Sequence, residues 1–394
     1  MCSSPSTPSA PRCARIWGRH WVSRRASTLW MGIDMDSMKP GRRRFLGGLL
    51  AAGLVPAPTW ADVGSPAYLS AAAKPDGAYV LCGISAALDV LFEIPLPVRG
   101  HAAAGHPARP EAVAFARRPG TVAMVINCAT GTPKATLDAP EGRHFYGHGA
   151  FSADGAWLFT TENDFEAGRG VVGVWDVAAG YKRTGEFDSG GVGPHDIKRL
   201  PGSDTLVIAN GGIDTHPGSG RAKLNIATMQ PNLSYAENGR ITETTSLPAD
   251  LHMNSIRHLD VAPTGDVAFG MQWQGDTPVA SLVGVHKRGA APVLLDAPAE
   301  DARRLDGYIG SIAFSKDGKS IAATSPRGSV LHVYDAENMR LKASLDLEDV
   351  CGVATHETGF TLTSGTGLLS GLRGQNLQSG SRAKQAWDNH LVLL

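Results

Sequence analysis

The chain has 394 residues, 42% hydrophobic and 19% charged, which is enough for one large all-β domain or two ordinary domains. Its 37 basic and 37 acidic side chains give a formal net charge of zero, which excludes an overall field that recruits nucleic acid or an anionic membrane surface. The 47 glycines and 25 prolines follow no period, as expected for a β fold with many tight turns.

The N-terminal region contains an export signal. Arginines at 42–44 precede Phe45-Leu46, a short apolar run covers residues 48–55, and small residues follow at Thr59 and Ala61. This is the pattern of a twin-arginine (Tat) signal peptide, and it predicts cleavage after Ala61 and release into the periplasm. A basic tail beside an apolar segment is the alternative. Eight apolar residues are too few for a stable membrane helix, so no permanent membrane anchor is expected.

Three segments are therefore predicted along the chain. Residues 1–37 are unpatterned and read as an over-extended translation start, residues 38–61 as the signal peptide, and residues 62–394 as the folded domain. The folded domain keeps three cysteines, Cys82, Cys128 and Cys351, which form no CxxC pattern. We expect them to be small core residues rather than zinc or haem ligands.

A repeated unit runs through the predicted folded domain. A short apolar run, a polar turn with glycine and a second apolar run recur seven times, most clearly at residues 151–160 and 314–323. The spacing fits four-stranded propeller blades of about 40–50 residues each. The sequence therefore predicts an all-β, seven-bladed β-propeller with WD40-like repeats. The turn glycines are Gly77, Gly120, Gly155, Gly202, Gly265, Gly318 and Gly359.

Each of these turns is interpreted as joining the first strand of a blade to the second, with glycine supplying the positive φ of a tight hairpin. Third strands are predicted near residues 170–177 and 329–335, and fourth strands at 182–187 and 340–345. Residues 387–393 are predicted to close the ring as a last strand, with a loose tail as the alternative. Insertions are expected around residues 211–230 and 297–307, the first as a lid over the channel mouth.

Three histidines share one position in the repeat. Counting back seven residues from the turn glycines gives His148, His195 and His258 in three consecutive blades, although the register of His195 is uncertain by one residue. First strands line the central channel of a propeller, so these side chains are predicted to meet at one mouth. Imidazole is a ligand for iron, copper and zinc, which makes the three histidines candidate metal ligands.

Polar loops after the second strands are predicted to surround the same mouth. They supply candidate ligand-binding residues, among which Arg257 favours carboxylate or phosphate groups. Propeller channels are also commonly lined by His, Ser and Asp that only bond backbone and water, so a structural role is the alternative. The candidate ligand-binding residues are Glu162, Asn163, Asp164, Asp214, His216, Arg257, Gln272 and Trp273.

Together with the Tat-like start, several segments resemble an uncharacterised bacterial family, domain-of-unknown-function 1513. The resemblance covers essentially the whole chain from Met38. It implies a periplasmic propeller, often encoded beside imelysin-like iron-uptake proteins, and it implies no established reaction. The matching segments are residues 143–149, 161–164, 193–196, 211–217, 254–259 and 387–391.

Two classes of function remain open from the sequence, and a pure scaffold that binds through a large exposed apolar patch is a third interpretation. The first is a non-enzymatic propeller that binds a metal ion, a metal chelate or a partner protein at the histidine-bearing face, in iron acquisition. The alternative is a metal-dependent hydrolase or lactonase in which a channel-mouth metal polarises a carbonyl or activates water, with His195, Glu162 and Asp214 as participants. No motif of a standard enzyme class is present in the sequence, so no catalytic residue is assigned.

Overall fold

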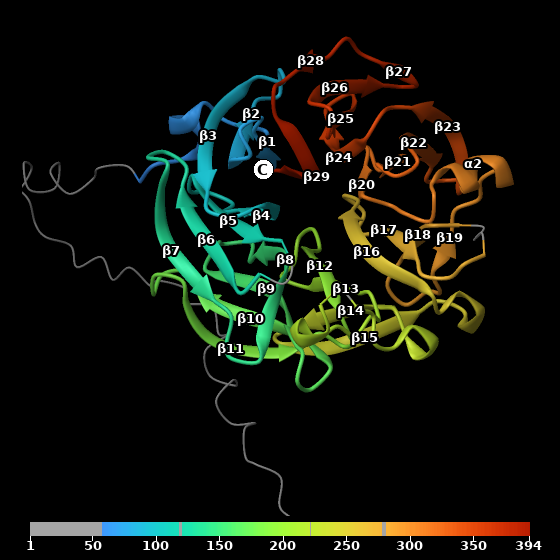
Figure 1. The fold of residues 1–394 in the computed structure, drawn as a ribbon, viewed down its shortest axis with the longest axis horizontal. Coiled ribbons are helices and arrows are strands. Elements are labelled where there is room, and N and C mark those ends of the chain that lie inside the picture. The colour runs from blue at the N-terminus through green and yellow to red at the C-terminus, as the bar shows by residue number, and fades with distance from the viewer. Residues whose placement is uncertain (1–56, 118–119, 221, 278–280) are drawn as a thin grey trace, which may run out of the picture. The chain divides into compact units, whose positions relative to one another are not determined.

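The computed structural model describes residues 57–117, 120–220, 222–277 and 281–394. Residues 58–394 form one unit. Its strands form antiparallel sheets set around a central axis as the blades of a propeller (Figure 1). Within the described residues there are seven such sheets, so the predicted seven-bladed β-propeller is confirmed. Residues 1–37 and nearly all of 38–61 lie outside the described ranges, and the signal peptide stays a prediction.

In the first four blades the strands follow one another outward from the axis. Blade 1 consists of β29 (Ala386–Leu393), β1 (Tyr68–Ala73), β2 (Tyr79–Ile84) and β3 (Val90–Leu96). Blade 2 consists of β4 (Gly100–Gly105), β5 (Glu111–Ala116), β6 (Val122–Asn127) and β7 (Thr132–Asp138). Blade 3 consists of β8 (Arg143–Phe151), β9 (Trp157–Asp164), β10 (Arg169–Asp176) and β11 (Lys182–Asp188). Blade 4 consists of β12 (Pro194–Arg199), β13 (Leu206–Asn210), β14 (Asn232–Glu237) and β15 (Arg240–Ser246).

The remaining three blades follow the same order. Blade 5 consists of β16 (Asn254–Val261), β17 (Val267–Trp273), β18 (Val283–His286) and β19 (Val293–Leu294). Blade 6 consists of β20 (Ser311–Phe314), β21 (Ser320–Ser325), β22 (Val330–Asp335) and β23 (Arg340–Asp346). Blade 7 consists of β24 (Val350–His356), β25 (Gly359–Ser364), β26 (Leu368–Arg373) and β27 (Asn376–Leu377), with β28 (Ser381–Arg382) also paired to β26. The predicted third and fourth strands of blades 3 and 6 are therefore confirmed.

Burial along each strand depends on its place in the blade. β13 is buried at every position because neighbouring blades cover both faces of its sheet. β15, at the outer edge of the same blade, alternates between exposed and partly buried residues. Strands buried on both faces read as continuous apolar runs, whereas edge strands alternate. The core therefore lies between the blades, as in the cluster that contains Tyr235, Phe269 and Phe314 of blades 4, 5 and 6.

The ring is closed by β29, which lies at the centre of the propeller (Figure 1). It pairs antiparallel with β1, from Leu393 opposite Tyr68 to Ala386 opposite Ala73. The predicted closing strand at residues 387–393 is thus confirmed. Because β29 is the inner strand of blade 1, β1 is the second strand of that blade, although it is the first strand in the chain.

Two turns differ from the sequence interpretation. Gly77 joins β1 to β2 and Gly120 joins β5 to β6, so both connect a second strand to a third. The first difference arises because blade 1 takes its inner strand from the other end of the domain. The second arises because the true first turn of blade 2, at residues 106–110, contains no glycine. Gly120 also lacks the positive φ that the tight hairpin interpretation requires.

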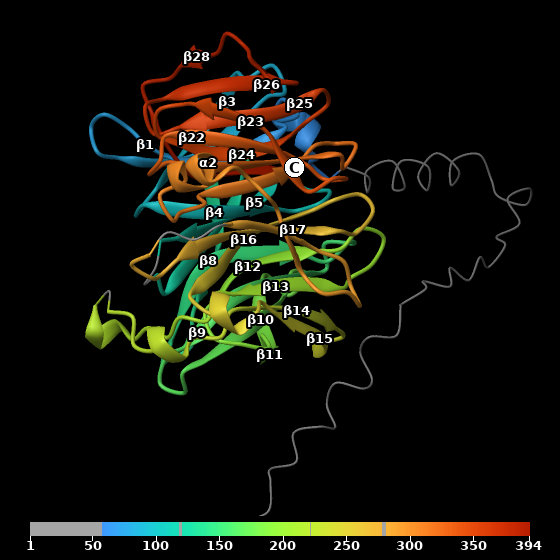
Figure 2. The ribbon, with the colours of Figure 1, turned by 90° about the vertical axis from the view of Figure 1, so that its right-hand side faces the viewer.

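Both predicted insertions are present. Residues 211–231 separate β13 from β14 and carry the 3-10 helices η4 (Pro217–Ser219) and η5 (Ile226–Thr228), and this segment projects from one face of the ring (Figure 2). Residues 295–310 carry α2 (Ala299–Arg304). Two further 3-10 helices are η3 (Trp60–Val63) and η6 (Ala249–Leu251). In the described part of the chain, no helix has both the length and the apolarity needed to cross a membrane.

The three cysteines are buried with free thiols, as expected of small core residues. Burial raises the pKa of Cys82 and that of Cys128 to about 12, so both thiols are protonated at neutral pH. The predicted cleavage point after Ala61 falls inside η3, where the Trp60 indole N–H donates to the His106 carbonyl at 2.8 Å.

Replacing Trp387 tests the ring closure. Its side chain is 3% exposed and packs with Tyr68 and Leu391. Since truncation of a buried aromatic side chain leaves a cavity, Trp387→Ala should lower the free energy of unfolding by about 3–5 kcal/mol in a urea titration. Leu393→Ala in the same strand removes a side chain that is 53% exposed and should change it by less than about 0.5 kcal/mol. Equal effects of the two substitutions would contradict the closure.

Candidate metal centre

Five histidines from consecutive inner strands meet inside the channel, and we call them the histidine cluster. They are His390 of β29, His101 of β4, His148 of β8, His195 of β12 and His258 of β16. In that order around the axis, neighbouring ring centroids are 4.5, 5.0, 5.1, 4.9 and, from His258 back to His390, 5.1 Å apart. Each of the five side chains is at most 9% exposed. The predicted arc of three is thus part of a compact cluster of five, in which the ring centroid of His148 also lies 4.6 Å from that of His390.

β-Bulges place these histidines. The pairing of β29, β4, β8, β12 and β16 with the adjacent strand shifts register at or immediately before the histidine. An extra residue in one strand bends it and redirects its side chains, so each bulge turns an imidazole toward the axis. The inner strand β24 has a bulge without a histidine, and β20 pairs regularly and presents Ser311.

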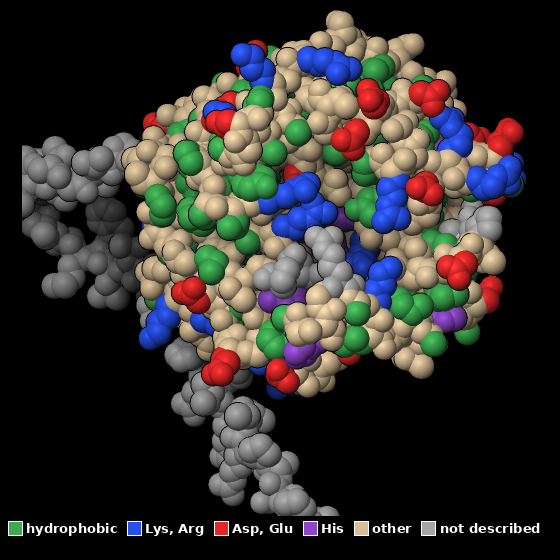
Figure 3. Space-filling model, in the orientation of Figure 1, with side chains coloured by type: hydrophobic (Ala, Val, Ile, Leu, Met, Phe, Trp, Pro, Cys, Tyr) green, Lys and Arg blue, Asp and Glu red, His purple; other side chains and the backbone are tan. Residues whose placement is uncertain are grey.

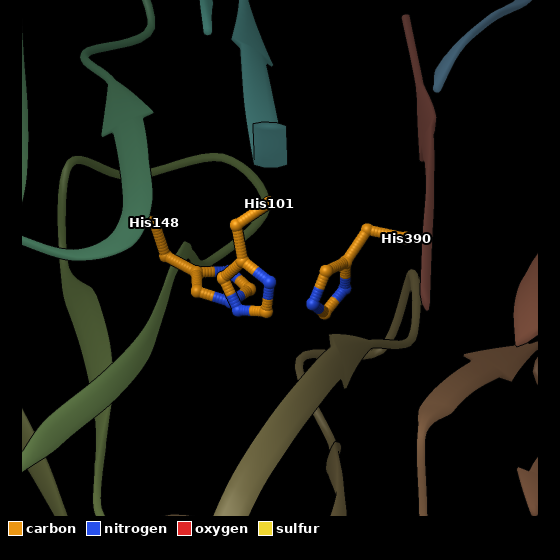
Figure 4. Close-up of side chains that lie close together, drawn as sticks. All are labelled: His101, His148 and His390. Atoms are coloured by element: carbon orange, nitrogen blue, oxygen red, sulfur yellow. The ribbon is translucent and has the colours of Figure 1, made fainter. Parts of the chain in front are cut away.

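Two overlapping triads have the spacing of metal ligands. One is His101, His148 and His390, whose rings converge from three blades (Figure 4), and the other is His148, His195 and His258. Within each triad the ligand nitrogens lie within 4.8 Å of one another. Nitrogens bound tetrahedrally to one zinc ion are about 3.3 Å apart, as follows from Zn–N bonds of about 2.0–2.1 Å. Small side-chain rotations therefore bring either triad to bonding distance.

Asp196 fixes the shared ligand of the two triads. Its carboxylate lies 3.0 Å from Nδ1 of His148 and also accepts a hydrogen bond from the Leu259 amide at 2.9 Å. Burial by itself raises the pKa of Asp196, but His148, Lys198 and the Leu259 amide together hold it below its ordinary value. The carboxylate therefore holds Nδ1 of His148 and leaves Nε2, which has no hydrogen-bond partner among the described residues, as the nitrogen available to a metal ion. Metal-ligating histidines are commonly oriented by a carboxylate in this way.

The environment keeps the other imidazoles neutral. Burial, with repulsion from His148, lowers the pKa of His258 to about 3. The pKa values of His101, His195 and His390 also lie well below 6.5, and burial is the first cause for each. For His195 the second cause is the charge of Arg257. Neutral imidazole is the form that binds a metal ion. Six ring nitrogens of the cluster have no hydrogen-bond partner among the described residues: Nδ1 of His101 and His195, Nε2 of His148 and His390, and both nitrogens of His258.

The cluster divides the channel between two cavities. The first, which we call the mouth cavity, has a volume of about 590 Å³ and is lined in part by His101, His195 and His258. Basic side chains gather around the centre of the face that carries it (Figure 3). The second, of about 430 Å³, is lined in part by His148 and His390, together with Asp196 and Asp260. Each of the five histidines therefore lines at least one of the two cavities, and His258 lines both.

The candidate ligand-binding residues divide into two groups. His216, Arg257, Gln272 and Trp273 line the mouth cavity, so the structure brings them together with His195 and His258. The insertion also contributes to this wall, through Thr215, Pro217, Gly220 and Lys223.

The other four candidates are not in the lining of the mouth cavity. Glu162 is fully buried in blade 3, where it accepts hydrogen bonds from Arg183 and Thr160, and Asp164 pairs with Arg169 and Arg143. These contacts hold both carboxylates within the blade.

Asn163 contacts the insertion at residues 211–231, and Asp214 is part of it. The Asn163 side chain donates to the Thr215 carbonyl at 2.9 Å, which ties blade 3 to the insertion. The Asp214 backbone amide donates to the Asn225 side-chain oxygen at 2.7 Å, and this contact folds the insertion back on itself. Both residues therefore help to position the wall of the mouth cavity.

Sequence reasoning missed His101, His390 and Asp196 as members of the site. His101 was missed because counting back from Gly120 reaches Val113 on the second strand β5. His390 was missed because the inner strand of blade 1 comes from the far end of the domain, and counting back from Gly77 reaches Ser70 on β1. A signal existed for Asp196, which directly follows His195, but its role depends on a contact between blades.

Acid should destabilise the metal-free protein. An unfolded histidine takes up a proton near pH 6.5, whereas folded His258 does so only near pH 3. The unfolded state therefore binds more protons between these values, and the free energy of unfolding falls as the pH is lowered, by about 1.4 kcal/mol per pH unit for each such histidine.

In urea titrations of chelator-treated protein from pH 6 to pH 4, His258→Gln should flatten this slope. The control is Leu393→Ala, which removes no titratable group and should leave the slope as in the parent protein. A slope that His258→Gln does not alter would show that the ring is already protonated in the folded protein.

Gly147 is required beside His101. It has a φ of +104°, and a Cβ at this position would lie 2.5 Å from Cδ2 of His101. Gly147→Ala should therefore displace the His101 ring in a crystal structure and lower stability by more than the left-handed backbone alone costs, about 1–2 kcal/mol. Gly180→Ala is the matched control, because Gly180 has a φ of +75° and no heavy atom within 4 Å of its Cβ position. An equal loss of stability in both variants would show that contact with His101 does not require glycine at position 147.

Comparison with solved structures supports the fold and leaves the function open. Hydrazine synthase of Kuenenia stuttgartiensis is similar with a TM-score of 0.54 and 14% sequence identity, over 84% of this chain and 98% of that chain. At this identity the likeness shows the β-propeller architecture alone. A search of curated protein sequences found no match.

The sequence itself matches a family profile described as "Protein of unknown function (DUF1513)" over residues 94–394. The match runs from the end of β3 through all later strands, so it includes all five histidines of the cluster and Asp196. The chain belongs to the DUF1513 family.

Proposed function

We propose that this chain is an exported β-propeller that binds one divalent transition metal ion, as the free ion or as a chelate, through the histidine cluster. The observation that carries the proposal is the set of buried ring nitrogens without a hydrogen-bond partner among the described residues, with His148 oriented by Asp196. Buried polar atoms normally have partners, and a bound ion would supply one to several of these nitrogens at once.

The donor set narrows the choice of metal. Imidazole nitrogen suits iron, copper and zinc, whereas magnesium and calcium prefer carboxylate, carbonyl and water oxygen. Three imidazoles with a carboxylate behind one of them are the donor types found in three-ligand zinc sites, in which a fourth position stays open. We therefore expect iron, copper or zinc.

The geometry favours one ion for each chain. Both triads contain His148, whose Nδ1 is held by Asp196, so only Nε2 remains for a metal. A single nitrogen lone pair serves one ion at a time. The two triads are thus alternative positions for the same ion, one on each side of His148.

The proposed cellular role, export followed by a part in iron acquisition, is supported by the sequence alone. The twin-arginine pattern at residues 42–46 supports export to the periplasm in a folded state, which permits a ligand to be bound before translocation. The family resemblance supports a role in iron acquisition beside imelysin-like components. We do not propose the hydrolase alternative, because Glu162 and Asp214 are absent from the lining of the mouth cavity.

Elemental analysis tests the proposal. Protein exported by a bacterial host and purified without chelators, or reconstituted with iron(II), copper(II) or zinc, should carry about one metal ion per chain. The His148→Ala/His195→Ala/His258→Ala variant should carry less than a tenth of that amount, because it keeps only His101 and His390. Asp196→Asn should weaken metal binding by about 10–100-fold, as loss of an outer-shell carboxylate does.

His332→Ala is the control. His332 is fully buried in blade 6, and its Nε2 also has no hydrogen-bond partner among the described residues, but it lies outside both triads. Its replacement should leave the metal content unchanged. Metal content that persists in the triple variant, or a parent protein that takes up none of the three metals, would refute the proposal.

A further inference from the structure

Basic residues predominate among the charged residues that line the mouth cavity. Five basic side chains line it, and none of the described lining residues is an aspartate or a glutamate. They come from blades 2, 5 and 6, the insertion and the residue before β4, although the chain as a whole has no net charge. The five are Arg99, Arg117, Lys223, Arg257 and Arg327. Like charges held close around a concave surface attract and concentrate anions.

One acidic group outside the lining contacts two of these basic side chains. Asp388 lies 2.7 Å from Nε of Arg99 and 4.0 Å from Arg117, so one carboxylate serves two guanidinium groups. Lys223 donates to the neutral Gln274 side chain, and Arg327 lies over the Tyr308 ring with its guanidinium carbon 4.5 Å from the centroid. The contact with Tyr308 orients the Arg327 guanidinium without adding a negative charge.

The wall also contains polar groups that a ligand would satisfy. Thr215 is 4% exposed, and its hydroxyl has no hydrogen-bond partner among the described residues. The indole N–H of Trp273 also has no hydrogen-bond partner among the described residues. Both residues line the mouth cavity, where a hydroxyl and an N–H are suitable donors to an anionic oxygen.

From this arrangement we infer that the mouth cavity binds a small organic anion with two or more carboxylates. Arginine matches a carboxylate with two parallel hydrogen bonds, and Arg257 and Arg327 supply such groups from neighbouring blades. A cavity of about 590 Å³ has the size of an organic ligand site, and its mainly polar wall includes three aromatic side chains, Tyr146, Trp273 and Tyr308, against which a short carbon skeleton can pack. Inorganic phosphate has the charge but no carbon skeleton to contact these side chains.

The cavity reaches the histidine cluster directly, through His101, His195 and His258. This part of the inference rests on the proposed metal site. A carboxylate bound in the cavity would take the open coordination position of an ion held by His148, His195 and His258. By linkage, the anion would then raise the affinity for the metal by the same factor as the metal raises the affinity for the anion.

Calorimetric titration with citrate tests the inference. Citrate should bind the parent protein, and Arg257→Gln/Arg327→Gln should weaken the binding at least tenfold. The control, Arg240→Gln/Arg382→Gln, removes two exposed arginines outside the cavity and should change the affinity less than twofold. Equal affinities in the two double variants would overturn the inference, and so would phosphate that binds as tightly as citrate.

The two proposals fail in different ways. Citrate binding to metal-free protein that Arg257→Gln/Arg327→Gln weakens, in a protein that takes up no metal, would support the anion site and refute the metal site. Stoichiometric metal with citrate binding insensitive to the two arginines would refute the anion site alone. If both sites exist, the metal-loaded parent protein should bind citrate at least tenfold more tightly than the His148→Ala/His195→Ala/His258→Ala variant.

Discussion

The inner strands of seven blades converge on one axis, and the candidate site depends on this convergence. Regular strands would send alternate side chains toward the two faces of each sheet. Bulges at one level redirect a residue of β29, β4, β8, β12 and β16 into the channel instead. The other two inner strands, β20 and β24, carry Ser311 and Gly352 instead of a histidine. These small residues leave room in the channel for the five imidazoles.

Burial of the histidine cluster lowers the stability of the folded state. Imidazole rings lose hydration when they are buried, and those without partners are destabilising unless water or a ligand satisfies them. The blades around the channel compensate with apolar packing, in which Phe115, Phe145 and Phe269 are fully buried. Functional sites commonly retain unfavourable groups that the surrounding structure holds in place. Burial therefore both lowers the pKa of His101, His195, His258 and His390 and leaves ring nitrogens of these side chains without hydrogen-bond partners among the described residues.

The sequence was sufficient for the fold because turn signals and strand alternation are local. The repeat predicts seven blades, the closing strand and both insertions, and the structure has all of them. It also places His148, His195 and His258 together, because these lie in blades whose first turn carries a glycine.

His101 and His390 were beyond local reasoning for different reasons. The first turn of blade 2 lacks the glycine, and the inner strand of blade 1 is separated from the rest of its blade by almost the whole domain. Bulges add to the difficulty, since they interrupt the alternation by which an inward side chain is recognised. The cationic lining of the mouth cavity was equally hidden, because its five residues come from segments far apart in the chain.

The position of β29 has a consequence for the order of events in the cell. This strand is synthesised after all the other described strands, and it carries His390 and covers β1. A nascent chain on the ribosome can build the blades one after another, but it lacks the fifth imidazole and leaves the channel open at one side until β29 emerges. Any cofactor that needs the complete cluster is therefore acquired only after β29 has emerged from the ribosome.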